Sequence, residues 1–435
     1  MPRLTKLWPF MVAALLLGML GTAQAAPTKK VTKTEVKEPE PPKAEWSFKP
    51  SIYSRGGLTY THGLSTLSQR DTLGDTFNIG SYADETDAIR PNLTEAQVVF
   101  TYRNKVRYTY GFDVDNDRRM ASGNDDRTEL NERLNFIEYL DGNNTYWFGK
   151  RAYRGDGEYL TGKWFLDELN IMGGGIQIKK ITDKLNAEFA YGSVGNSIDT
   201  NPDLSRPENV FVNKIEYPLT NGKLKSNLEI HRYNADAKAN RAWSYVIGGE
   251  YQRWGDKLAG GSLYNRWVLN YSHGPIGAGM MTVINEGVDP EQNVAQTKNR
   301  HPSKILLSWN GDYKNSAYSF YYTMVYQRHA GKNAKLKFTT LDIYLRPMYN
   351  VKGNFYAGID YAGRPVASRT GVDRAWSNAK VHRYALMGEY KPNWQNTSFR
   401  VLVGRISSKV ARTYTTSGDK KNASFIRLGY EVSIN

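Results

Sequence analysis

The 435-residue sequence contains no cysteine, so no disulfide framework stabilises its fold. Its six histidines show no metal-ligand spacing, and no nucleophile-elbow, zinc-protease or phosphate-loop motif is present. These absences argue against an enzyme or an adhesin with a metal site. We therefore expect no catalytic residues, no metal and no cofactor.

Long hydrophobic runs are also missing beyond the first 25 residues. Arg3 and Lys6 precede an apolar run over residues 7–20, and a small-residue cleavage site follows at Ala23-Gln24-Ala25. This run is shorter than the roughly 20 residues that a membrane-spanning helix needs. It is typical of a secretory signal peptide, which we place at residues 1–25. The mature chain is thus expected to be exported and to lack a transmembrane helix.

Acidic residues are outnumbered by basic ones, which gives a net charge of +15. The signal segment contributes +2 and the linker at residues 26–45 contributes +1, so the remainder carries +12. A nucleic-acid partner is not expected for an exported chain without a recognition motif. The positive net charge is explained more simply by a pore lined by arginine and lysine, or by contact with acidic lipid headgroups.

Residues 26–45 consist mainly of proline, lysine, glutamate and threonine, a composition that cannot bury a core. They are predicted to form a disordered or semi-rigid linker. The domain after them, residues 46–435, is rich in aromatic residues and glycine: the chain has 30 Tyr, 15 Phe, 10 Trp and 39 Gly. Such a composition favours a sheet protein, and aromatic girdles are typical of membrane barrels.

A period of two recurs along this domain. Apolar and polar residues alternate over residues 108–115, 185–191, 355–361 and 426–434. Strict alternation predicts strands with one apolar and one polar face, and none of these windows has helical spacing. A secreted sandwich, propeller or solenoid would also alternate. Charged residues on the polar faces throughout, without a domain break, favour a membrane barrel instead.

Short turn signals alternate with long polar segments along the domain. Turns are expected at residues 141–143 and 220–222, and long loops at residues 63–92 and 274–302. This alternation is typical of an up-and-down barrel with tight periplasmic turns. We count about 19 candidate strands, among them strands that start near Glu132 and Gly174, and the weakest is Ile276–Asn285. Since single-chain bacterial barrels have even strand numbers, we predict an all-β, transmembrane, antiparallel barrel of about 18 strands around an aqueous channel.

One connection stands out, between a strand at Thr145–Arg151 and the glycine-rich segment near Gly173. It holds both charged and large aromatic residues. Loops of this length are uncommon and usually functional or disordered. We predict that it folds inward and narrows a water-filled pore. The alternative is an ordinary extracellular loop.

The sequence resembles the maltoporin family of sugar-specific outer-membrane porins over nearly the whole domain. The matching segments, in family order and spacing, are Ile52–Gly57, Tyr146–Tyr153 with Gly173–Gly175, Leu345–Tyr349, Ile359–Tyr361, Ser368–Gly371 and Phe399–Leu402. The resemblance implies a homotrimer of 18-stranded barrels, each with the loop near Arg154 folded into its pore. It also implies a line of aromatic residues flanked by polar groups along the channel.

Individual positions follow from this resemblance. Matches to the aromatic line are Tyr53, Tyr264, Trp394 and the loop residue Trp164. Matches to the flanking polar residues are Arg55, Arg90 and Arg127, with Arg133 as an alternative to Arg127. The family's loop arginine falls beside Arg154, and its loop carboxylate falls on Gly162, so Asp156 or Glu158 is expected to replace it. Each aromatic could instead belong to a lipid-interface girdle, and each arginine could serve only barrel rigidity.

The expected function is facilitated, passive diffusion of carbohydrates, such as maltodextrins or related sugars, through the outer membrane of a Gram-negative bacterium. The expected partners are carbohydrate solutes, outer-membrane lipid and further copies of the chain. The alternative is a general or anion-selective porin for small solutes, favoured by the positive charge of the domain.

Overall fold

The structure is a computed structural model. It describes residues 45–62, 92–118, 126–160, 165–166, 168–182, 184–194, 207–235, 240–274, 303–330, 338–369, 381–392, 396–408 and 422–434. The expected signal peptide and all but the last residue of the expected linker lie outside these ranges. The barrel domain is a separate unit that begins at Glu45.

The barrel domain consists of 18 strands in one sheet. Their bounds are β1 Trp46–His62, β2 Asn92–Tyr102, β3 Val106–Arg118, β4 Asp126–Asp141, β5 Asn144–Arg154, β6 Glu168–Ile178, β7 Asn186–Val194, β8 Pro207–Leu219, β9 Gly222–Ala235, β10 Asn240–Leu258, β11 Gly261–His273, β12 Ser303–Lys314, β13 Tyr318–Ala330, β14 Phe338–Lys352, β15 Phe355–Arg369, β16 Val381–Tyr390, β17 Asn396–Ser408 and β18 Asn422–Ile434.

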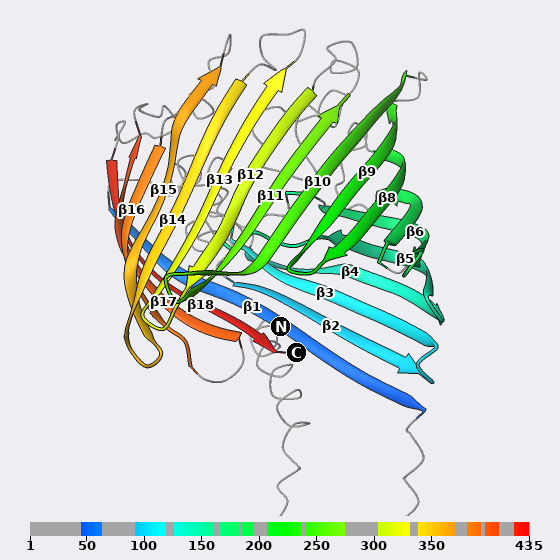
Figure 1. Ribbon diagram of the computed structural model, residues 1–435, viewed down its shortest axis with the longest axis horizontal. Helices are drawn as coiled ribbons and strands as arrows, with labels where there is room; N and C mark the ends of the chain where they lie inside the picture. Colours follow the sequence, from blue (N-terminus) through cyan, green and yellow to red (C-terminus); the bar gives the residue numbers. More distant parts are fainter. Residues whose placement is uncertain are drawn as a thin grey trace, which may run out of the picture. The chain divides into compact units, whose positions relative to one another are not determined.

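The sheet closes on itself. Each strand pairs antiparallel with its neighbours in sequence, and β1 pairs with both β2 and β18. In Figure 1 the blue β1 accordingly lies between the cyan β2 and the red β18. Closure removes free sheet edges, so every strand backbone has partners on both sides. The predicted antiparallel barrel of about 18 strands is confirmed.

Alternation along each strand separates two faces, as the sequence predicts. On β5, Phe148 is 71% exposed on the outer face, whereas its neighbour Trp147 is 4% exposed on the inner face. On β16, Leu386 is 69% exposed outside, between the buried Ala385 and Met387. An apolar exterior of this kind suits contact with lipid hydrocarbon.

Tight turns join the strands at one end of the barrel. Gly142 and Gly353 adopt positive φ angles of 57° in the β4–β5 and β14–β15 turns, and Asn104 has a φ of 56° in the β2–β3 turn. Glycine and asparagine adopt this left-handed region most readily. Ring pairs such as Trp46–Tyr102 and Phe355–Tyr390, each with centroids 4.6 Å apart, cover the outer surface beside these turns. They form one girdle of aromatic residues.

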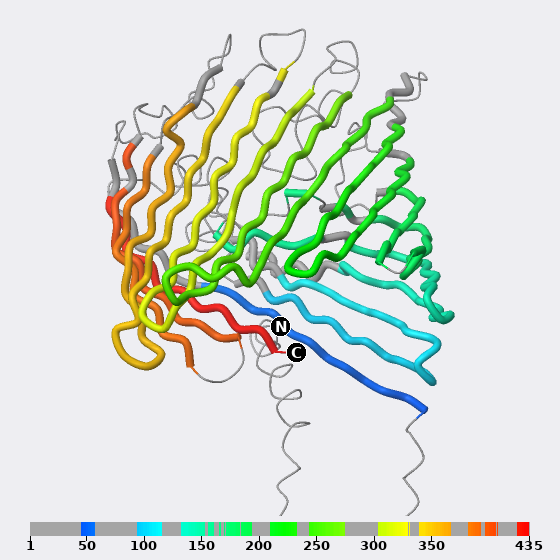
Figure 2. Tube along the Cα trace, in the orientation of Figure 1, coloured from blue at the N-terminus to red at the C-terminus, as the bar shows by residue number. Residues whose placement is uncertain are grey.

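The predicted strand starts differ from the structure by a few residues. The largest differences are at β4 and β6, which begin at Asp126 and Glu168 rather than near Glu132 and Gly174. In Figure 2 the coloured parts of the tube follow the same order of strands from blue to red. The weak candidate Ile276–Asn285 lies outside the described residues. Among the described residues, no helix has the length and apolar character needed to cross a membrane.

Candidate functional site

The connection after β5 continues from the strand as Gly155–Leu160, and its next described residues are Phe165 and Leu166. Asp156 is held by two lysines of β9: its Oδ2 lies 2.8 Å from the Nζ of Lys223 and 2.7 Å from that of Lys225. It also accepts a hydrogen bond from Gln252 of β10. Burial alone would raise the pKa of Asp156, but the two ammonium groups lower it well below its ordinary value. This carboxylate therefore stays ionised and fastens the loop to β9 and β10.

The next charged residue, Glu158, points toward a different part of the inner wall. Its Oε1 accepts a hydrogen bond of 2.9 Å from the amide of Leu160 and another from the hydroxyl of Thr323 on β13. Both Glu158 and Thr323 are buried. A buried carboxylate with satisfied acceptors holds the loop in one conformation.

Tyr159 reaches further round the barrel, to β14 and β17. Arg400 donates a hydrogen bond of 2.8 Å to the Tyr159 hydroxyl. The guanidinium carbons of Arg346 and Arg400 each lie 5.6 Å from the centroid of the Tyr159 ring, within the range of cation–π attraction. Tyr321 of β13 contacts the same ring, with centroids 4.8 Å apart.

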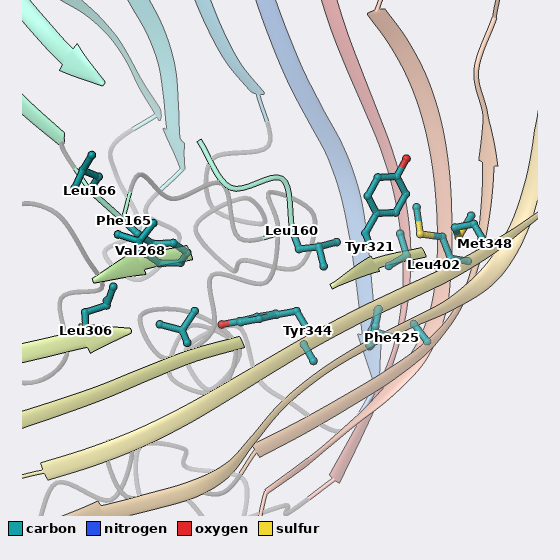
Figure 3. Close-up of a cluster of buried hydrophobic side chains, with 14 residues drawn as sticks. Leu160, Phe165, Leu166, Val268, Leu306, Tyr321, Tyr344, Met348, Leu402 and Phe425 are labelled. Carbon is teal, nitrogen blue, oxygen red and sulfur yellow. The ribbon is translucent and has the colours of Figure 1, made fainter. Parts of the chain in front are cut away.

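Apolar residues of the loop complete its attachment. Leu160, Phe165 and Leu166 are at most 3% exposed and join a buried cluster with inward-facing residues of β11–β18. Figure 3 shows Phe165 beside Val268. Asparagines of the wall bond the loop backbone: Asn270 donates to the carbonyl oxygens of Phe165 and Leu166, and Asn227 donates to that of Leu166. The described part of the loop thus lies against inward-facing side chains of the barrel.

The inner wall formed by β1–β8 carries ion pairs that remain partly exposed. Arg133 pairs with Glu95 and lies 3.7 Å from the carboxylate of Asp113. Arg151 lies 3.6 Å from Glu188. The side chains of Glu95 and Arg133 are 29% and 15% exposed, so groups of both signs can be reached from the lumen.

Two cavities follow this half of the wall. One, of about 300 Å³, is lined by Tyr53, Glu95 and Arg133 among others. The second, of about 340 Å³, is lined by Arg151 and Glu188 together with residues of β6, β8 and β9. Both contact Ala152, so they are neighbours along the inner wall.

The wall formed by β14–β18 differs, because its arginines are covered. Arg346, Arg364, Arg383 and Arg400 are at most 4% exposed. They bond carboxylates of neighbouring strands in the pairs Arg346–Asp360–Arg383, Arg364–Asp342 and Arg400–Glu389. Buried charges of this kind need such partners, and these pairs cross-link adjacent strands. They are not placed to contact a solute in this conformation.

The sequence-predicted residues fall into two groups. Tyr53 and Arg55 face the interior on β1: the Tyr53 hydroxyl donates a hydrogen bond of 3.0 Å to Glu431, and its strand position alternates with the outward Trp46 and Phe48. Tyr264 alternates with the outward Trp267 and Leu269 and so faces inward on β11. Inward placement is incompatible with a lipid-facing girdle for Tyr53 and Tyr264.

Five other predicted residues lie partly or wholly outside the part of the chain that the structure describes. Arg127 belongs to β4 and Arg154 to β5, but the structure does not describe their side chains. Arg90, Trp164 and Trp394 lie wholly outside the described residues. Their roles in binding stay predictions. The same holds for the binding roles of Tyr53, Arg55, Asp156, Glu158 and Tyr264. The alternative candidate Arg133 does lie in the inner-wall ion-pair network.

Sequence reasoning did not select Arg151, Glu188, Lys223 or Lys225. Their alternation with outward residues such as Phe148, Phe189 and Leu224 would have placed them inside. Arg133 was harder to assign, since the β3–β4 register shifts at Gly111/Phe112. This bulge inserts a residue into β4 and changes which face its later residues occupy.

Comparison with solved structures returns outer-membrane channels with little sequence identity. The OccD3 (OpdP) structure from Pseudomonas aeruginosa is 10% identical, with a TM-score of 0.49, over 89% of this chain and 91% of that chain. The DcaP channel of Acinetobacter baumannii is 10% identical, with a TM-score of 0.49, over 90% and 99%. Pseudomonas aeruginosa OccK2 (OpdF), solved in complex with glucuronate, is 9% identical, with a TM-score of 0.47, over 89% and 98%.

No curated protein matches the sequence. The comparison with protein families is decisive, because it covers most of the barrel domain and agrees with the closed sheet of 18 strands. The sequence matches LamB porin over residues 91–431, so this chain belongs to the LamB porin family of outer-membrane channels and is not an enzyme.

Proposed function

We propose that this porin mediates facilitated diffusion of carbohydrates along the inner wall formed by β1–β8. The observation that carries the proposal is the pair of neighbouring cavities lined by the ion pairs Arg133–Glu95 and Arg151–Glu188. Tyr53 lines the first of these cavities.

The chemistry of a sugar matches this lining. A pyranose has apolar C–H faces and a rim of hydroxyl groups that both donate and accept hydrogen bonds. An aromatic ring covers the apolar faces, while a carboxylate accepts from a hydroxyl and a guanidinium donates to one. An ion pair whose cation and anion are both exposed therefore offers a donor and an acceptor to the hydroxyl groups of a neutral sugar. It does not select for solutes of one net charge. Binding must stay weak and repeated so that the sugar moves on.

In this proposal the loop after β5 is the constriction. Its attachments to β9, β10, β13 and β17 through Asp156, Glu158 and Tyr159 support such a role. A loop fixed at several points of the wall reduces the cross-section without closing it. Arg154 and Trp164 are expected to contribute further contacts from the same loop. The functional unit is a homotrimer.

The direct test is sugar block of ion current through the purified protein in planar bilayers. Addition of malto-oligosaccharides, or of a broader panel of neutral sugars, is expected to interrupt the current transiently. Tyr53→Ala is expected to shorten the blocks, and Tyr326→Ala, on the outer face of β13, is the matched control. A panel of sugars that produces no block at any concentration would refute the proposal.

A general or anion-selective porin is the second candidate. Lys223 and Lys225 favour it, since both lie on the inner face beside the loop and have side chains 22% and 17% exposed. Reversal potentials in a salt gradient separate the two functions. Strong anion preference together with absent sugar block would support this second candidate.

A further inference from the structure

Exposed basic residues gather at the end of the barrel where the tight turns lie. Cations stand in or beside the β2–β3, β6–β7, β10–β11, β12–β13 and β14–β15 turns. We define the turn collar by six of them, all with exposed side chains: Arg103, Lys105, Lys179, Lys257, Lys314 and Lys352. These turns are spread around the closed sheet, so the positive charge surrounds the barrel instead of forming one patch.

Acidic residues do not cancel this charge. Among the residues that the structure describes at the turn end, Glu45 pairs with Arg103, and Asp312 lies 3.1 Å from Lys314. Asp141, in the β4–β5 turn, is exposed as well. With these three carboxylates counted, the six cations still leave the turn collar with a net positive charge. A partner of this surface must therefore be anionic.

The aromatic girdle fixes the depth of the turn collar in the membrane. Arg103 directly follows Tyr102, and its guanidinium carbon lies 5.0 Å from the centroid of that ring. Lys352 is the cross-strand partner of Phe355, whose ring packs on Tyr390 in the girdle. Cross-strand neighbours lie about 5 Å apart, and the headgroup layer on each side of a bilayer is about 5–8 Å thick. The cations therefore lie at the level of lipid headgroups, just outside the hydrocarbon layer.

We infer that the turn collar binds phospholipids with a net negative headgroup. The tight turns of an outer-membrane barrel face the periplasm, so these lipids belong to the inner leaflet of the outer membrane. Ammonium and guanidinium groups donate charge-assisted hydrogen bonds to phosphate oxygens. A zwitterionic headgroup carries its own cation beside the phosphate, which weakens its attraction to the collar. Because the cations come from several turns, several anionic lipids bind around one barrel.

Two other occupants fit the geometry less well. A second copy of the chain would present the same positive charge at its own turns, so two collars repel each other. The carboxylates of peptidoglycan could also bind a basic surface. That polymer lies beyond the membrane, however, whereas Arg103 and Lys352 adjoin rings of the girdle. The phosphates of the inner leaflet are the anions at their level.

The test compares lipid adducts of the purified, full-length protein by native mass spectrometry. Phosphatidylglycerol or phosphatidylethanolamine with identical acyl chains is added to the protein in detergent. The wild type is expected to retain several-fold more phosphatidylglycerol. Glutamine in place of Lys105, Lys257 and Lys352 together should remove most of this preference. Arginine at the same three positions is the matched control and should keep it, because the charge is unchanged.

Equal retention of the two lipids by the wild type, or an unchanged preference in the glutamine variant, would overturn the inference. Cosedimentation with isolated peptidoglycan tests the alternative occupant. The wild type and the glutamine variant are expected to cosediment to the same extent, since the collar is assigned to lipid. Cosedimentation that is lost only in the glutamine variant would assign the collar to the polymer instead. Heat-modifiability on gels, expected to equal that of the wild type, is the folding control for both variants.

Discussion

The hydroxyl of Tyr159, on the loop after β5, accepts a hydrogen bond of 2.8 Å from Arg400 on β17. Arg400 also pairs with Glu389 and lies 3.2 Å from Glu431, so the tyrosine connects the loop to an existing network of charges. The ring lies against Arg346 as well. This one side chain therefore connects the loop to both β14 and β17.

Replacing Tyr159 by alanine is expected to enlarge the channel. It removes the hydrogen bond, both cation–π contacts and the packing on Tyr321, so the loop loses its attachment to β14 and β17. Single-channel recordings should show higher conductance and shorter sugar blocks. Tyr159→Phe keeps the ring and is expected to change both values much less. Identical conductance in the alanine variant and the wild type would show that Tyr159 does not position the loop.

Asp156 gives a prediction about pH. Its pKa is lowered from its ordinary value, so the charged form stabilises the folded loop at any pH above that value. That stabilisation is lost only as the pH falls through the lowered pKa. Conductance and current noise should therefore not change between pH 7 and pH 5 on account of this residue.

Asp156→Asn is expected to raise current noise already at neutral pH, since Lys223 and Lys225 lose their common partner. Asp256→Asn is a suitable control, because Asp256 pairs with Arg253 near the β10–β11 turn, whereas Asp156 pairs with the lysines of β9. The current noise of the wild type could instead rise steeply between pH 7 and pH 5 while that of Asp156→Asn does not. That result would contradict the lowered pKa of Asp156.

Arg133 and Glu95 are expected to determine the charge selectivity of the first cavity, which Tyr53 also lines. Glu95→Gln removes one carboxylate charge beside Arg133 and leaves that of Asp113 in place, so the cavity gains net positive charge. Reversal potentials should shift toward anion preference, and blocks by neutral sugars should shorten. Asp312→Asn on β12 is the control, since Asp312 is not among the residues that line this cavity. An unchanged reversal potential would show that the ion path avoids this cavity.

The fold was predictable because one rule governs each strand. A barrel in lipid needs an apolar outer face and closed pairing, so alternation and turn residues such as Gly142 and Gly353 determine most of the strand boundaries. The start of β4 was placed too late, since the segment before Glu132 has a single apolar residue, Leu130, and adjoins a bulge. Alternation alone gives no signal for an inserted residue.

The site was only partly predictable. Inward placement of Tyr53, Arg55 and Tyr264 follows from strand parity. The partners of Asp156 and Tyr159 do not follow from strand parity. They come from β9 and β17, which are distant from the loop in sequence, and their contact with it depends on how the loop crosses the interior. The burial of the β14–β18 arginines is likewise a tertiary effect. From the sequence alone, these arginines could not be distinguished from partly exposed ones such as Arg133.

The glycine-rich middle of β6 provides a test of how closely the strands of the wall pack. Gly173 and Gly192 are direct cross-strand partners on β6 and β7. A Cβ atom on Gly173 would lie 2.2 Å from the carbonyl oxygen of Tyr191 and 2.6 Å from the Cα of Gly192. Both of these are backbone atoms, so the strands would have to separate locally.

Gly173→Ala is therefore expected to destabilise the barrel by about 1–3 kcal/mol, as for other overpacking substitutions. Heat-modifiability on gels should show unfolding at a lower temperature than in the wild type. Gly388→Ala on β16 is the matched control, since nothing lies within 4 Å of a Cβ there and its φ is not positive. Equal melting of the two variants would mean that β6 and β7 lie further apart at Gly173 than this register places them.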